Sequence, residues 1–141
     1  MKRVLVVMGM LLTACSAASD CHDGEVSRHG TCYYRAHDWA PLAERERLEA
    51  LFTARVPAAA EVWAQLHVEA MPGAFYCGTV PAAGCTLGPG LVQVQALPLC
   101  ASELVHEVAH IVSAREHGDY DYGHTGEIWA EVMETRKECE R

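Results

Sequence analysis

The cysteines are the feature that most constrains what this chain can fold into. There are seven of them in 141 residues. Such a density is typical of small exported domains that depend on disulfides because their hydrophobic core is limited. A cysteine-ligated metal cluster is the other arrangement that uses so many cysteines, but it commonly contains C-x-x-C pairs, and none occurs here. We therefore expect disulfides and an oxidising compartment.

The first residues predict export and account for one of the cysteines. Two basic residues precede an apolar stretch at residues 4–12, which is too short to span a bilayer as a helix. The stretch ends in Leu12-Thr13-Ala14-Cys15, which resembles the lipobox of bacterial lipoproteins, where cleavage exposes a cysteine that carries the lipid. The resemblance implies a signal peptide at residues 1–14, a lipidated tether at residues 15–20 and a folded domain at residues 21–141.

The lipid on Cys15 would anchor the domain to a membrane of a bacterial cell envelope. Ser16, rather than an aspartate, follows this cysteine, and by resemblance to envelope sorting rules the serine favours the outer membrane. The alternative is an ordinary signal peptide cut after Ala14 or Ala18, which would release a secreted domain.

The other cysteines belong to the folded domain, and their even number predicts three disulfides. Six cysteines can pair in fifteen ways, and the sequence alone does not choose among them. Proximity along the chain favours pairing the first with the second and the third with the fourth, which leaves the last two. In chain order the candidates are Cys21, Cys32, Cys77, Cys85, Cys100 and Cys139.

The spacing of apolar residues predicts a small α+β domain. Helical spacing indicates one N-terminal helix before Pro57 and two helices near the C-terminus, whereas alternation indicates a short three-stranded sheet between them. The alanines at residues 58–60 leave a helical start to the first strand as an alternative. The predicted helices are residues 39–55, 101–116 and 126–140, and the predicted strands are residues 62–70, 74–80 and 91–97.

The charge of the chain limits its partners. Nineteen acidic residues against eleven basic ones give a formal net charge of −8. Binding of nucleic acid needs a clustered basic face, so we expect no nucleic-acid partner.

The helix predicted at residues 101–116 contains an H-E-x-x-H motif, His106-Glu107-Val108-Ala109-His110. Residues four apart lie on the same face of a helix, so both imidazoles can bind a single zinc ion. Glu107 can take a proton from a zinc-bound water and pass it to a leaving amine. A chance match would seldom fall in an amphipathic segment free of glycine and proline, as this one does.

A catalytic zinc ion needs a third protein ligand and an open position for water. The downstream candidates are His117, Asp119, Asp121, His124, Glu127 and Glu131. His124 lies in the segment Gly123-His124-Thr125-Gly126-Glu127-Ile128-Trp129, directly before the last predicted helix. This pair of motifs resembles the SprT-like (Spartan-type) zinc metallopeptidases, whose second motif reads G-H-G-P-E followed by a bulky residue. Here Thr125 and Gly126 replace the second glycine and the proline.

The resemblance covers residues 100–135 and implies a zincin-like domain with one zinc ion per chain. It assigns His106, His110 and His124 as the ligands and Glu107 as the general base. It gives supporting roles to Glu127 and Trp129. The SprT-like enzymes are largely intracellular and several act on DNA-associated protein. Because this chain is acidic and predicted to be exported, only the catalytic module is carried over.

Two other assignments at this site stay open. The segment Glu127-Ile128-Trp129-Ala130-Glu131 also resembles the helix of gluzincins that supplies a glutamate as the third ligand. In that alternative Glu127 binds the metal, although the Gly-His context and the suitability of imidazole for zinc favour His124. Tyr120 and Tyr122 could donate a hydrogen bond to the oxyanion of the transition state, but packing within the turn is the favoured role.

These features together predict a monomeric, envelope-anchored zinc metallopeptidase that cuts peptide bonds of a peptide or protein by attack of a zinc-activated water. If residues 91–97 lie at a sheet edge, an extended peptide could pair with them next to the zinc. The alternative is a non-catalytic envelope lipoprotein whose zinc site is structural or binds a partner.

Overall fold

A computed structural model describes residues 21–141, so the predicted signal peptide, the tether and Cys15 lie outside the described residues. The four helices are Leu42–Arg55 (α1), Ala59–Trp63 (α2), Leu104–His117 (α3) and Ile128–Cys139 (α4). The seven strands are Glu25–Val26 (β1), Cys32–Tyr34 (β2), His67–Met71 (β3), Phe75–Cys77 (β4), Val80–Ala82 (β5), Gly84–Thr86 (β6) and Leu91–Gln95 (β7). The predicted α+β class is confirmed.

The main sheet has five strands in the order β1-β2-β3-β7-β6, and β4 and β5 form a separate hairpin. Strands β2, β3 and β7 are parallel, whereas β1 and β6 run antiparallel to their neighbours. The prediction of a single three-stranded sheet was therefore wrong. The strands that the prediction lacked, β1, β2 and β6, are only two or three residues long. Such strands are too short for an alternation of apolar residues to be detected.

Two predicted strands have different boundaries in the structure. The strand expected at residues 62–70 begins only at His67, because α2 occupies its start. Val62 and Leu66 are four residues apart and both are buried, so their spacing suits a helix as well as a strand. The strand expected at residues 74–80 is the β4–β5 hairpin, which reverses at Gly78 with a positive φ of 63°.

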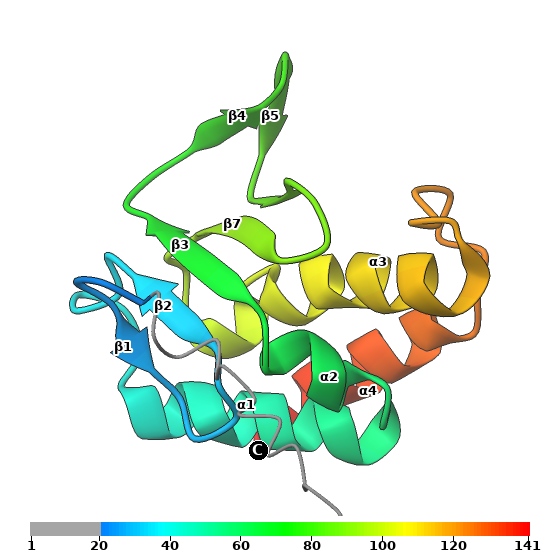
Figure 1. The fold of residues 1–141 in the computed structure, drawn as a ribbon, viewed down its shortest axis with the longest axis horizontal. Helices are drawn as coiled ribbons and strands as arrows, with labels where there is room; N and C mark the ends of the chain where they lie inside the picture. The colour runs from blue at the N-terminus through cyan, green and yellow to red at the C-terminus, as the bar shows by residue number, and fades with distance from the viewer. Residues whose placement is uncertain (1–20) are drawn as a thin grey trace, which may run out of the picture.

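Helix α3 is the centre of the fold and carries the H-E-x-x-H motif. It contacts β6 and β7 of the sheet and each of the other three helices. Leu104, Val108 and Ile111 of this helix are fully buried in the core. Gly118 ends the helix in the left-handed conformation that glycine adopts at helix ends. In Figure 1 helix α3 runs just below β7, helices α1, α2 and α4 lie lower still, and the β4–β5 hairpin projects above β7.

Three disulfides fasten this small domain, with the pairing that proximity along the chain favours. Cys21–Cys32 joins the start of the described chain to β2, and Cys77–Cys85 joins the hairpin to β6. Cys100–Cys139 joins the turn before α3 to the end of α4. Disulfides of this kind are typical of an oxidising location, extracellular or in the cell envelope. Within residues 21–141, no helix has the length and apolarity that crossing a membrane requires.

Candidate metal centre

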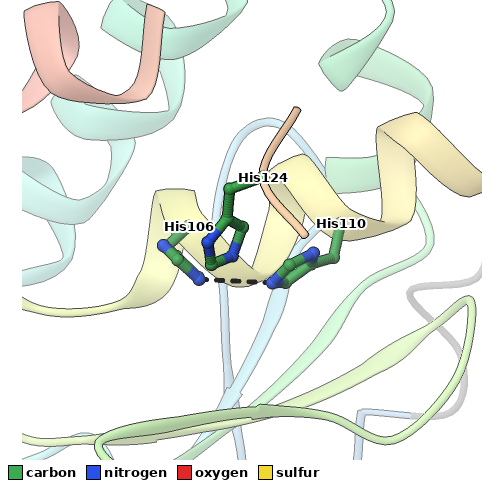
Figure 2. A group of neighbouring side chains, drawn as sticks. All are labelled: His106, His110 and His124. Atoms are coloured by element: carbon green, nitrogen blue, oxygen red, sulfur yellow. Dashed lines mark hydrogen bonds between the residues drawn. The ribbon is translucent and has the colours of Figure 1, made fainter. Parts of the chain in front are cut away.

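Three histidines from two parts of the chain meet beside α3. His106 and His110 lie on successive turns of the helix, and their Nε2 atoms are 3.2 Å apart. His124 joins them from the loop between α3 and α4, as Figure 2 shows, and the candidate ligand atoms all lie within 4.8 Å of one another. Two nitrogen ligands of a tetrahedral zinc ion are roughly 3.3 Å apart. The cluster could therefore hold a metal ion of this kind.

The loop that carries His124 is organised by the side chain of Asp121. Its carboxylate accepts hydrogen bonds from the backbone N–H groups of Thr125 and Gly126 (3.0 and 2.7 Å), from the Thr125 hydroxyl (2.9 Å) and from Trp129 Nε1 (2.7 Å). These donors hold the pKa of Asp121 well below its usual range. Both Asp121 and His124 have positive φ angles, 52° and 54°. The hydrogen bonds compensate for this uncommon backbone conformation and fix the position of His124.

Neighbouring groups leave the two helical histidines in a form that could bind a metal ion. The Nδ1–H of His110 donates to the backbone oxygen of Tyr120 at 2.7 Å, so the lone pair of a neutral ring is on Nε2. Nδ1 of His106 lies 3.4 Å from the carboxylate of Glu103, which Arg136 also binds at 2.9 Å. Burial lowers the pKa of His106 to about 4 and also lowers the pKa of His110. Both rings are therefore neutral near pH 7, the form that binds metal.

Glu107 is a buried carboxylate beside the histidine cluster, and only 6% of it is exposed. Its Oε2 accepts a hydrogen bond of 2.7 Å from the hydroxyl of Thr86 on β6. Burial raises the pKa of Glu107 to about 7. A cavity of about 340 Å³ opens at this carboxylate, and its walls also include His110 and Tyr122. A group that can exchange a proton thus faces the same space as a candidate metal ligand.

The structure places the other predicted site residues in different roles. Tyr120 contributes its backbone oxygen to His110 and packs against the core. Tyr122 is 67% exposed, and its ring centroid is 5.0 Å from that of His110. Glu127, the alternative third ligand, is not part of the histidine cluster. Its side chain is exposed at the residue before α4, and it lines two surface pockets together with Glu116.

Trp129 lies directly beside the cluster. Its ring centroid is 5.0, 4.7 and 4.3 Å from those of His106, His110 and His124, respectively. An indole against three imidazoles restricts the rotation of each ring and shields one side of the cluster from water. The supporting role that the resemblance implies for Trp129 stays a prediction.

The strand at residues 91–97 does not offer the peptide-binding edge that the sequence suggested. Strand β7 is paired on both sides, with β3 and β6. The outer strand next to the site is β6, which contacts α3 and supplies Thr86. The sequence did not reveal Thr86, nor Gly84 on the same strand, where an added Cβ would lie 2.9 Å from Cδ of Glu107. It also did not reveal the role of Asp121, because all these contacts depend on tertiary packing and have no local pattern.

No protein-family model, curated protein or solved structure matches this chain. The resemblance of residues 100–135 to the SprT-like family stays a prediction. What the site does must therefore be inferred from its own geometry.

Proposed function

We propose that this protein is a zinc-dependent peptidase. The observation that carries the proposal is the shared cavity: Glu107, a buried carboxylate, and His110, one of three clustered histidines, line the same opening. Peptide hydrolysis at a metal needs ligands, a proton acceptor and space for the substrate next to both. Residues of α3, β6 and the loop before α4 would meet these three requirements in one place, which supports the proposal.

His106, His110 and His124 would hold the zinc ion, and the described residues at the cluster offer no fourth ligand of their own. Zinc held in this way would lower the pKa of its water to about 7 and would polarise the carbonyl of the substrate. A structural zinc site has four protein ligands instead. The group of three therefore favours a catalytic centre over the alternative of a non-catalytic lipoprotein with a structural or partner-binding site.

Glu107 acts as general base and then as general acid in this proposal. A carboxyl group with a pKa near the working pH can accept a proton from the attacking water and return it to the leaving amine. The hydroxyl of Thr86 holds one carboxylate oxygen in place at 2.7 Å. Of the two tyrosines, Tyr122 is the one that lines the cavity, so it is the better placed to donate to the developing oxyanion.

We propose that Cys15 carries a lipid and that the domain works on peptides or proteins at the outer membrane. The three disulfides support an oxidising location. Metabolic labelling with an alkyne fatty acid tests the anchor, because the wild type should take up label and Cys15→Ser should not. Equal labelling of the two would contradict the lipid assignment.

The decisive experiment measures metal content and hydrolysis on the same protein samples. The wild type should bind one zinc per chain, His110→Ala and His124→Ala should lose it, and Glu127→Ala should keep it. Glu107→Gln should keep the zinc but lose about 10²–10⁴-fold of its activity on a casein-derived peptide mixture. Full activity of Glu107→Gln, or a wild type that binds no zinc, would refute the proposal.

A further inference from the structure

The β4–β5 hairpin forms one wall of the cavity at the candidate metal centre. Val80 and Ala82 of β5 line this cavity together with Cys77 of β4, opposite Glu107 and His110 on α3. Figure 1 shows the hairpin rising above the sheet and α3. The hairpin is not part of the main sheet, so it adds little to the core. Its contribution to the cavity is the function that its position suggests.

The hairpin is fixed to the strand that positions Glu107. Its Cys77 forms a disulfide with Cys85 of β6, and the next residue, Thr86, donates its hydroxyl to the carboxylate of Glu107. Cys77 and Val80 are direct partners across the hairpin, so their side chains are on the same face. A covalent link of this kind holds the wall at a constant position relative to the catalytic glutamate.

The chemistry of the lining selects an uncharged ligand. Apart from Glu107 and the imidazole of His110, the cavity has no acidic or basic side chain. Val80, Ala82, the disulfide and the ring of Tyr122 supply apolar surface. Val80 and Tyr122 are 63% and 67% exposed, an arrangement that leaves apolar surface in water unless a ligand covers it. An acidic side chain would lose its hydration there without gaining a Lys or Arg partner, and it would lie near the carboxyl group of Glu107.

We propose that this cavity receives an uncharged, apolar side chain of the substrate, aliphatic or aromatic, next to the bond that is cut. The inference rests on the proposed peptidase function and names its substrate class. The substrate residue is placed beside the scissile bond because Glu107 and His110 border the same cavity. The hairpin thereby determines specificity, whereas α3 supplies the catalytic groups.

The test compares the binding of three probes to the zinc-loaded full-length protein by calorimetry. Phenylpropionyl, isocaproyl and succinyl monohydroxamate share a metal-binding head, but only the last carries a charged tail. The two apolar probes should bind at least about tenfold more tightly than the succinyl probe, because a hydrophobic cavity favours an apolar tail over a charged one by about this factor. Val80→Lys should abolish or invert this preference, because it adds a cation to the wall.

Tyr76→Lys is the matched control for this substitution. Tyr76 is on the same hairpin and is 68% exposed, close to the 63% of Val80. It precedes Cys77 in β4, so its side chain is on the opposite face of the hairpin. This variant should keep the preference for apolar probes. Equal binding of all three probes by the wild type, or a preference that survives in Val80→Lys, would overturn the assignment.

Cleavage of a peptide mixture, read by mass spectrometry, separates this inference from the proposed function. Apolar residues should be enriched at one position beside the cut in the wild type, and acidic residues should replace them with Val80→Lys. Hydrolysis without such a preference would overturn the cavity assignment and leave the peptidase proposal standing. Probe discrimination that depends on Val80, with no hydrolysis of any peptide, would refute the peptidase proposal and support the cavity assignment.

Discussion

Gly84→Ala tests how closely β6 must approach the helix that carries the site. A methyl group at Gly84 would lie 2.6 Å from Cβ of Glu103 and 2.9 Å from Cδ of Glu107. Carbon atoms in normal contact are about 3.5–4.0 Å apart, so β6 and α3 must separate by about 1 Å. Inserting a methyl group into such a tight contact costs about 1–3 kcal/mol of stability.

The same displacement affects the chemistry, because Glu107 would move with the contact. A shift of about 1 Å in a catalytic group can lower the rate by about 100-fold. We expect Gly84→Ala to retain zinc, since no histidine of the cluster is among the nearest atoms to the added methyl. Its free energy of unfolding in urea should fall by about 1–3 kcal/mol, and the proposed peptidase activity should fall by about 100-fold.

Gly73→Ala provides the matched control. A Cβ at Gly73 would have no heavy atom within 4 Å, so this substitution should change stability by less than about 0.5 kcal/mol. The stability measurement does not depend on the proposed function. If Gly84→Ala proves as stable as Gly73→Ala, the close approach of β6 to α3 is wrong, and so is the positioning of Glu107 derived from it.

Three further predictions concern the loop, the core and the disulfides. Asp121→Ala should weaken zinc binding by about 10–100-fold, because it removes a group that orients a proposed ligand. Competition with a chromophoric chelator measures the affinity, and an unchanged affinity would contradict the role of the loop. Burial raises the pKa of Glu49, so the stability contributed by its protonated form is complete below pH 4.5 and is lost as the pH rises through the raised pKa. The stability of the wild type relative to Glu49→Gln should therefore decline with pH in urea unfolding, and a constant or rising difference would refute this. Replacing both Cys100 and Cys139 by serine removes a disulfide between residues that are 39 apart in sequence. The free energy of unfolding should fall by about 4 kcal/mol, because the unfolded chain gains conformational entropy. A fall of less than about 1 kcal/mol would contradict this entropic explanation.

The features that could be predicted from the sequence are those encoded locally. The spacing of His106 and His110 places them on one helical face before any tertiary contact is known. The glycine that ends α3 and the apolar spacing along it located that helix to within a few residues. His124 could also be identified, because its glycine-histidine segment lies directly before the last predicted helix and resembles the second motif of the SprT-like family.

The rest depends on contacts between segments that are distant in sequence. Thr86 and Glu107 are 21 residues apart, and nothing near either residue indicates the hydrogen bond. Asp121 is one of several acidic residues after α3, and the sequence presents it only as a possible ligand. Its actual partners become visible when the loop folds back on itself. Strand β6 is short and antiparallel to β7, so the sheet edge near the site cannot be located from alternation.

The Cys100–Cys139 disulfide has a consequence for how the site could acquire its metal. The bond closes a covalent ring that contains His106, His110 and His124. Within that ring the three imidazoles keep a high effective concentration relative to one another even when the helices are unpacked. If the histidine cluster binds a metal ion as proposed, a chain that has formed this disulfide could bind the ion before it is fully folded. A chain that lost its ion would keep the three histidines close enough to bind another.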